Sequence, residues 1–101
     1  MFPLNPTPPE KLCDAEGRPY FLWDSDMTLA AFLELLDHDD PHVRAHAVGK
    51  LLRQARTDDA LTFVTLEAVE RDWPLVRRHL GRRREFWEWL LPKLVGHELD
   101  A

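Results

Sequence analysis

A run of arginines near the C-terminal end is the densest group of side chains capable of chemistry. Arginine presents a planar fork of N–H donors that matches a carboxylate or a phosphate group. Like charges at this density repel one another, so the run indicates an anionic partner, either an acidic protein surface or the phosphates of a nucleic acid. The alternative is a solvated face balanced by Glu70, Glu85 and Glu88. The residues that we expect to make the contact are Arg77, Arg78, Arg82, Arg83, Arg84 and Trp87.

Three histidines recur every four residues, at His38, His42 and His46. If that segment were helical throughout, they would share one face, and a His pair at i and i+4 can chelate a metal ion. His38, however, falls in a predicted turn, and the sequence identifies no partner that would orient a ligand ring. We therefore expect solvated surface histidines and no metal site.

Five aspartates have side chains suited to acid–base chemistry, but each lies at a predicted helix start or turn. An Asp there caps the helix and meets the positive end of its dipole, whereas catalytic carboxylates need burial or a like-charged neighbour to shift their pKa. The chain also has no nucleophile elbow, glycine-rich phosphate loop, zinc-binding His-Glu pattern or paired-cysteine motif. The sequence thus predicts a protein that is not an enzyme and binds no cofactor. The aspartates are Asp37, Asp39, Asp40, Asp58 and Asp59.

Charge is unevenly distributed along the 101 residues, a length that makes one domain. Residues 1–70 carry 13 acidic and 6 basic side chains, a sum of −7, whereas residues 71–84 carry six arginines and one aspartate, a sum of +5. A formal net charge of −5 therefore conceals a basic region on an acidic body. Such a chain can approach an anion that a uniformly acidic protein would repel.

Cys13 is the only cysteine, which rules out an intrachain disulfide and fits a reducing compartment. The N-terminus lacks a basic region followed by an apolar run, so no signal peptide is predicted. No apolar run approaches the roughly 18 residues that span a membrane. We expect a cytoplasmic protein with no membrane partner.

The elements that must position these residues are helices. Apolar residues recur at i, i+3, i+4 and i+7 from Leu29 to Leu36, and Thr28 is placed to cap that stripe. Asp40 and Pro41 form the cap and first residue of a second helix, which runs to about residue 55. On this helix Gly49 is small enough to let another helix approach closely.

Shorter helices follow. Capping residues at 57–59 and Thr65 predict two of them, and Trp73-Pro74 marks a further boundary. The last helix begins at about residue 82, and Pro92 must kink or end it. Strand-length alternation of apolar and polar residues is absent, and β-branched residues are few. The sequence therefore predicts an all-α fold, a compact bundle of about five short helices.

The two ends of the chain differ from this helical domain, which covers residues 20–95. Residues 1–19 are typical of an irregular, partly flexible arm, because closely spaced prolines remove backbone donors and fix φ so that a helix cannot settle. Residues 20–24, Tyr-Phe-Leu-Trp-Asp, form an aromatic segment that we expect to pack on the protein's own core. Residues 96–101 are predicted to fray.

The hairpin predicted at residues 29–55 carries a set of apolar and charged positions, which are Leu29, Leu33, Leu36, Asp39, Pro41, Val43, Arg44, Ala47, Leu51 and Leu52. In these positions it resembles one HEAT-type helical hairpin, in which the Asp caps and the Arg braces neighbouring repeats. A solenoid needs about three stacked repeats to bury its faces, and the chain has no second copy. The resemblance implies a homo-oligomeric scaffold whose edges stack on symmetry mates.

A wider set of landmarks spans roughly residues 18–91. It consists of Phe21-Leu22-Trp23-Asp24-Ser25-Asp26, Leu51-Leu52-Arg53-Gln54-Ala55, Asp58-Asp59-Ala60-Leu61, Thr65-Leu66-Glu67-Ala68-Val69 and Phe86-Trp87. In order and spacing it resembles a family of small bacterial proteins of unassigned function that are encoded beside nucleotidyltransferase-type toxins of the abortive-infection class. The resemblance implies an antitoxin-like or accessory role and carries over no catalytic residue.

Three functions follow from these patterns. The preferred one is a non-catalytic accessory protein that binds another protein, such as a nucleotidyltransferase toxin, through the arginine cluster and exposed aromatic residues. The first alternative is a nucleic-acid-binding regulatory module that uses Arg77 to Arg84. The second is the homo-oligomeric HEAT-like scaffold, and the oligomeric state stays open.

Overall fold

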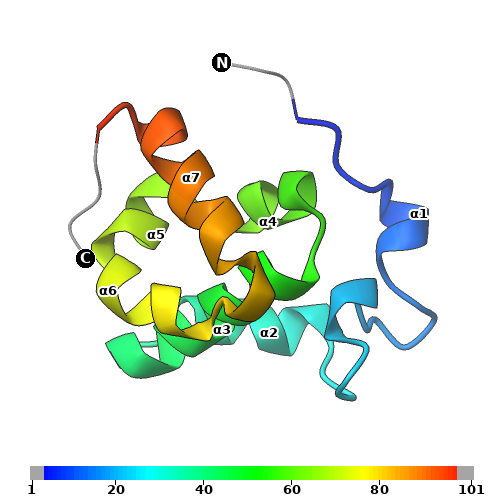
Figure 1. Ribbon diagram of the computed structural model, residues 1–101. Coiled ribbons are helices and arrows are strands. Elements are labelled where there is room, and N and C mark those ends of the chain that lie inside the picture. The colour runs from blue at the N-terminus through cyan, green and yellow to red at the C-terminus, as the bar shows by residue number, and fades with distance from the viewer. Residues whose placement is uncertain (1–3, 98–101) are drawn as a thin grey trace.

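The structure is a computed structural model that describes residues 4–97. Its regular elements are helices and short helical turns (Figure 1). Within that range the only β contact is an isolated bridge between Cys13 and Pro19, and the all-α prediction is confirmed. Residues 1–3 of the predicted arm and 98–101 of the predicted frayed tail lie outside the described residues. With η for a 3-10 turn, the elements are α1 (Pro9–Leu12), η1 (Tyr20–Leu22), α2 (Leu29–Leu36), α3 (Pro41–Gln54), α4 (Thr57–Phe63), α5 (Leu66–Arg71), α6 (Trp73–Val76), η2 (Arg77–His79), η3 (Gly81–Arg83) and α7 (Arg84–Val95).

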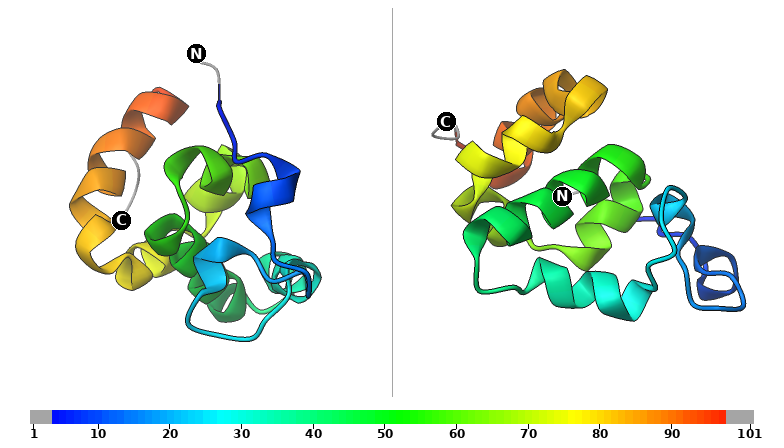
Figure 2. Two further views of the ribbon diagram at one scale, coloured as in Figure 1. Left: turned by 90° about the vertical axis from the view of Figure 1, so that its right-hand side faces the viewer. Right: turned by 90° about the horizontal axis from the view of Figure 1, so that it is seen from below.

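The central helix is α3, with α2 on one side and the segment from α6 to η3 on the other (Figure 2, right). It begins where the sequence predicts, because the Asp40 carboxylate accepts a hydrogen bond from the His42 N–H at 2.8 Å and Pro41 takes the first helical position. Since α3 is covered on two sides, most of its residues from Ala45 to Leu52 are buried. This helix is therefore the support on which the arginine-bearing segment rests.

Gly49 permits the close approach of α3 and η2. A Cβ atom at this position would meet the Cβ of His79 at 2.4 Å, which is shorter than real contacts allow. The prediction that this glycine lets a neighbouring helix come close is thus confirmed. Arg53 completes the same contact by donating from Nη1 to the His79 carbonyl at 2.7 Å.

Arg44 ties α3 to the junction of α5 and α6. Its Nε and Nη2 donate to the two carboxylate oxygens of Asp72 at 2.9 and 3.1 Å. Its Nη1 donates to the carbonyls of His38 and Asp39, in the turn before α3. The hydrogen bonds from Arg44 hold the pKa of Asp72 below its usual range although burial opposes them. One guanidinium therefore fixes both the α2–α3 turn and the start of α6.

The aromatic segment at residues 20–24 packs on the core through Phe21 and Leu22, which confirms the prediction for these two residues. The ring of Phe21 meets the ring of Phe32 on α2 edge-on, with 5.7 Å between centroids. Gln54 holds the segment in place, since its Nε2 donates to the Phe21 carbonyl at 2.7 Å. The next two residues of the segment, Trp23 and Asp24, are exposed, and 75% of the Trp23 surface faces solvent.

Two of the shorter helices begin at predicted caps and one does not. The hydroxyl of Thr28 accepts from a backbone N–H of α2, and Thr65 does the same for α5. The cap expected at residues 57–59 is wrong, because the residue before α4 is Arg56, whose side chain forms no capping hydrogen bond to the helix. The side chains of Asp58 and Asp59 are therefore free to bond elsewhere.

Pro92 does not end α7. The helix continues to Val95 and stops at Gly96, whose φ of 85° is the left-handed conformation that glycine adopts without strain. The Gly96 N–H donates to the Pro92 carbonyl at 2.9 Å. Pro92 has no N–H, so α7 lacks one backbone hydrogen bond at this point. The packing of Trp87 and Leu91 in the core stabilises the helix despite this loss, because tertiary contacts commonly outweigh local preference.

The arm contains a turn of helix that its prolines were expected to exclude. Pro8 takes the N-cap position of α1 and Pro9 its first helical position, where the missing N–H removes no hydrogen bond. None of the residues of α1 is buried. At the other end of the chain, the described start of the tail is held, because the ring of His97 contacts Glu70 on α5.

The helices are short. The longest one in the described part of the chain, α3, has 14 residues. No helix between residues 4 and 97 has both the length and the apolar composition that crossing a bilayer requires.

Candidate interaction surface

Part of the predicted arginine cluster is neutralised by a carboxylate of the same chain, that of Glu88. Arg77 on η2 donates from Nη2 to Glu88 on α7 at 2.9 Å, and Arg84 reaches the same oxygen from Nε at 3.4 Å. The Nε of Arg77 is buried and has no hydrogen-bond partner within the described chain. Glu88, one of the acids named as balancing charges, therefore engages two of the five guanidinium groups.

Arg83 is held between α4 and α7. Its Nη2 donates to the hydroxyl of Thr57 at 3.1 Å. Its guanidinium carbon lies 4.7 Å from the centroid of the Phe86 ring and 5.9 Å from that of the Trp87 ring. A cation over an aromatic face at an exposed site is worth about 0.5–1 kcal/mol. These contacts position the Arg83 side chain on the surface next to Phe86.

Arg78 and Arg82 are the two members of the cluster without an internal partner. Both are exposed, and neither side chain forms a hydrogen bond or ion pair with any residue from 4 to 97. An arginine that is solvated keeps its N–H donors available for an anion. The free positive charge of the cluster is therefore concentrated at these two positions.

Trp87 cannot contact a partner, and its assignment to the contact surface is wrong. Its side chain is fully buried, and its Nε1 donates to the Leu52 carbonyl of α3 at 2.8 Å. The physical reason is the helical period, which places Trp87 and Leu91 on one side of α7, against the core. The most hydrophobic side of the helix is therefore used for folding and is not available for binding.

Another side of α7 exposes two aromatic rings between two cations. The Trp89 side chain is 57% exposed and that of Phe86 is 36% exposed, with 6.2 Å between the ring centroids. The Lys93 ammonium lies 5.0 Å from the Trp89 ring centroid, and Arg83 covers Phe86. We call these four residues, Arg83, Phe86, Trp89 and Lys93, the α7 face.

The sequence predicts exposed aromatic residues at the contact, and Trp87 is the one that we assigned to it. The signal that identifies the others is helical spacing. Positions 86, 89 and 93 are related by i, i+3 and i+7 and share one side of a helix, while positions 87 and 91 share another. Choosing which side faces the core requires the tertiary structure.

The predicted histidine group does not converge. The Nδ1 of His38 accepts from the Asp40 N–H at 3.0 Å, whereas the ring of His46 faces His79 with 5.2 Å between centroids. Over the part of the chain that the structure describes, no three His, Cys, Asp or Glu side chains are placed to hold a metal ion. Burial lowers the pKa of His79, and the cationic groups around it act in the same direction.

Asp59 was expected to cap α4 and is instead a buried acceptor. It is 1% exposed and accepts hydrogen bonds from the Thr7 N–H at 2.7 Å, the Thr7 hydroxyl at 2.6 Å and the Tyr20 hydroxyl at 2.6 Å. Burial opposes its ionisation, but the hydrogen bonds outweigh burial and hold the pKa of Asp59 below its usual range. Asp58 accepts from the Asn5 N–H at 2.9 Å. These two carboxylates therefore fasten the N-terminal arm.

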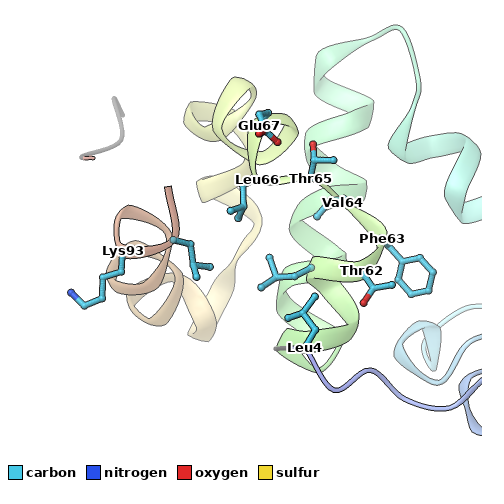
Figure 3. A pocket seen from close by; sticks show the side chains of 10 residues that line it. Leu4, Thr62, Phe63, Val64, Thr65, Leu66, Glu67 and Lys93 are labelled. Carbon is cyan, nitrogen blue, oxygen red and sulfur yellow. The ribbon is translucent and has the colours of Figure 1, made fainter. Parts of the chain in front are cut away.

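A groove of about 670 Å³ opens between α4, the beginning of α5 and the end of α7 (Figure 3). Leu4 of the arm lies at one end, and the Lys93 side chain is turned outward. Because Lys93 belongs both to the groove and to the α7 face, the two features border each other. The apolar lining residues are Leu4, Leu61, Phe63, Val64, Leu66 and Leu94.

The α7 face has the chemistry of a contact surface, because it combines exposed rings, fixed cations and a rigid helix as support. The histidines and aspartates, by contrast, are distributed over turns and over the contact with the arm. Comparisons of the chain with models of protein families, with curated proteins and with solved structures found no match.

Proposed function

We propose that this protein is a non-catalytic accessory protein that binds another protein through the α7 face. The observation that carries the proposal is the exposed pair of Phe86 and Trp89 between Arg83 and Lys93. Trp, Tyr and Arg are enriched among the residues that dominate the binding energy of protein interfaces. The rigid rings of Trp and Tyr bury large areas at little cost in side-chain entropy. The rings of the α7 face are already oriented by their cationic neighbours, which reduces the entropy lost on binding.

The charge near this face favours an acidic protein surface over a nucleic acid. Proteins that bind duplex DNA commonly neutralise about six to ten phosphates. Glu88 engages two of the five guanidinium groups of the cluster, those of Arg77 and Arg84, and Thr57 accepts a hydrogen bond from Arg83. The groups left without an internal partner are those of Arg78 and Arg82. A partner with a few carboxylates around an apolar centre matches such a surface more closely than a continuous phosphate backbone.

The resemblance to proteins encoded beside abortive-infection toxins supports a nucleotidyltransferase-type toxin as the partner. In this proposal the chain acts in the cytoplasm as an antitoxin-like protein, where its free Cys13 would stay reduced. It would inhibit by covering the active site or the substrate path of the toxin. No bond would be made or broken by the chain itself.

The test is co-purification with a nucleotidyltransferase-type toxin from the same genome, followed by a titration that measures Kd. Trp89→Ala removes the more exposed ring of the α7 face, and we expect Kd to rise about 30-fold, which corresponds to roughly 2 kcal/mol. Trp23→Ala is the matched control, because Trp23 is an even more exposed tryptophan outside the α7 face. We expect it to change Kd less than about twofold. Equal losses in the two variants, or a free monomer that ignores the toxin, would contradict the proposal.

Nucleic-acid binding is the second candidate, and the free guanidinium groups of Arg78 and Arg82 favour it. Its signature is salt dependence. With about two phosphate contacts, affinity for a labelled DNA duplex should fall about tenfold between 50 and 200 mM salt. Arg78→Ala and Arg82→Ala should each flatten the slope of log K against log salt by about one unit. Affinity for duplex and single strand that is unchanged in both variants would exclude this candidate.

A further inference from the structure

The N-terminal arm is fastened to α4 by polar contacts at two residues. The Asn5 N–H donates to Asp58, and both the N–H and the hydroxyl of Thr7 donate to Asp59. The Thr7 hydroxyl also accepts from the Nη1 of Arg56 at 2.9 Å. The Thr7 side chain is therefore bonded on both its donor and its acceptor side, and it forms the centre of the attachment.

The carboxylate that receives Thr7 has a second partner that does not belong to the arm. The Tyr20 hydroxyl donates to Asp59 and accepts from the Arg56 N–H at 2.8 Å. If the arm leaves, Asp59 keeps the Tyr20 bond, and water can replace Thr7. Detachment of the arm therefore does not strand a buried charge, which would otherwise cost several kcal/mol.

Little apolar surface holds residues 4–8 of the arm to the body of the protein. Leu4 is 41% exposed although it lines the groove, whereas the next anchor along the arm is Leu12 of α1, which packs against the core. Segments with few buried apolar contacts open at a free energy well below that of global unfolding. The side chains of Leu61, Val64 and Leu94, which line the same groove, belong to the helical body and stay in place when the arm opens.

We propose that residues 4–8 form a detachable strap, latched to Asp59 through Thr7, which covers one end of the apolar groove with Leu4 and exposes the groove when it opens. The occupant of the groove in the closed state is thus the protein's own arm. The strap contacts α4 and none of the four residues of the α7 face, so the strap can be tested apart from the proposed binding function even though Lys93 borders both the groove and that face.

The first test compares Thr7→Val with Thr7→Ser by hydrogen exchange of backbone amides in the full chain. Valine has nearly the same shape without the hydroxyl, whereas serine keeps it. We expect the Asn5 amide to exchange about tenfold or more faster in Thr7→Val than in the native chain, because a hydrogen bond to a charged group is lost. In Thr7→Ser we expect less than about a threefold change. Asn5→Pro, which deletes the donor to Asp58 at an exposed position, is a second variant that opens the strap if Thr7→Val fails to fold. Because proline has no N–H, the amide measured in this variant is that of Thr7, which donates to Asp59 and should also exchange about tenfold faster.

The second test measures whether the opened strap uncovers the groove, with the fluorescent probe 8-anilinonaphthalene-1-sulfonate. Thr7→Val should bind the probe several-fold more tightly than the native chain, and Thr7→Ser should not. Adding Thr62→Glu, which places a negative charge at the groove, should cancel the gain because the probe is anionic. Two results would overturn the proposal. One is an Asn5 amide that exchanges as slowly in Thr7→Val as the amides of α3 do, and the other is a gain in probe binding that persists after Thr62→Glu is added.

Discussion

At the scale of single residues, Trp87 and Trp89 show how two positions on one helix divide folding from binding. The Trp87 indole is buried and donates to the carbonyl of Leu52, while most of Trp89 faces solvent. Leu52 lies in the last turn of α3, where carbonyls have no partner within the helix, and its would-be donor, the Arg56 N–H, bonds the Tyr20 hydroxyl instead. The Trp87 indole therefore supplies a donor to a helix-end carbonyl. The two tryptophans should respond differently to the same substitution.

We expect Trp87→Phe to lower the free energy of unfolding by about 1–3 kcal/mol, because it removes the indole donor and leaves a space in the core. Trp89→Phe is the control and should stay within about 0.5 kcal/mol of the native protein. Urea denaturation followed by circular dichroism measures both. Similar losses in the two variants would show that the hydrogen bond to Leu52 does not matter to stability.

The pKa of His79 makes stability depend on pH. Burial, together with nearby positive charge, lowers this pKa from its usual 6.5 in the folded protein. On acidification the unfolded chain therefore takes up the proton first, and stability falls as the pH drops from about 6.5 toward the lower folded pKa. Above that window both states are neutral at this residue, and its contribution to the pH dependence vanishes.

We expect the free energy of unfolding to decrease below pH 6.5 by at most about 1.4 kcal/mol per pH unit from this residue. His79→Gln should lose this part of the slope, because glutamine does not titrate. Denaturation curves on either side of pH 6.5 measure it. A variant with the same slope as the native protein would assign the pH dependence to other groups.

At the scale of elements, the contact between α3 and η2 depends on the absence of one side chain. Gly49 sits inside α3, where alanine would normally stabilise a helix by up to about 1 kcal/mol. Here its Cβ would collide with that of His79, and overpacking of this kind costs about 1–3 kcal/mol. The tertiary contact therefore outweighs the preference of the isolated helix.

We expect Gly49→Ala to lower Tm although it raises helix propensity. In a His79→Gly background, which removes the opposing Cβ atom, the same substitution should be neutral or stabilising. Thermal unfolding of the four proteins of this double-mutant cycle measures the coupling between the two positions. Independent effects at the two positions would rule out the steric explanation.

At the scale of the whole molecule, the ion pair between Arg44 and Asp72 links segments that are 28 residues apart. It joins the start of α3 to the start of α6, and Arg44 also binds the turn after α2. Asp72 is nearly fully buried, so an Arg44 left without it would face a poorly solvated site. The pair therefore helps to set the relative placement of three helices.

We expect Asp72→Ala to destabilise the fold by roughly 3 kcal/mol, because it leaves a positive charge unpaired in the interior. In the double variant with Arg44→Met, the loss of unfolding free energy should be smaller than the sum of the losses in the two single variants, because neither charge is left unpaired. Asp26→Ala, which breaks an ion pair between a fully exposed carboxylate and Arg18, is the control and should have a much smaller effect. Strictly additive losses would show that the pair does not act as a unit.

Local patterns in the sequence determined where the main helices lie. Thr28, Asp40-Pro41 and Thr65 mark starts that the structure confirms, because capping bonds join residues two or three positions apart. The apolar stripes of α2 and α3 likewise show in the chain order, since hydrogen bonds in a helix connect i and i+4. The all-α class follows from these local rules.

Only the tertiary structure decided what the charged and aromatic residues do. Glu88 takes Arg77 and Arg84 out of the arginine cluster, and Asp59 accepts from Thr7, which lies 52 residues away, instead of capping its own helix. Trp87 is buried where Trp89 is exposed, although both belong to the same helix. The physical reason is that a helical period defines the sides of each helix, while the packing of helices against one another decides which side is buried and which distant groups meet.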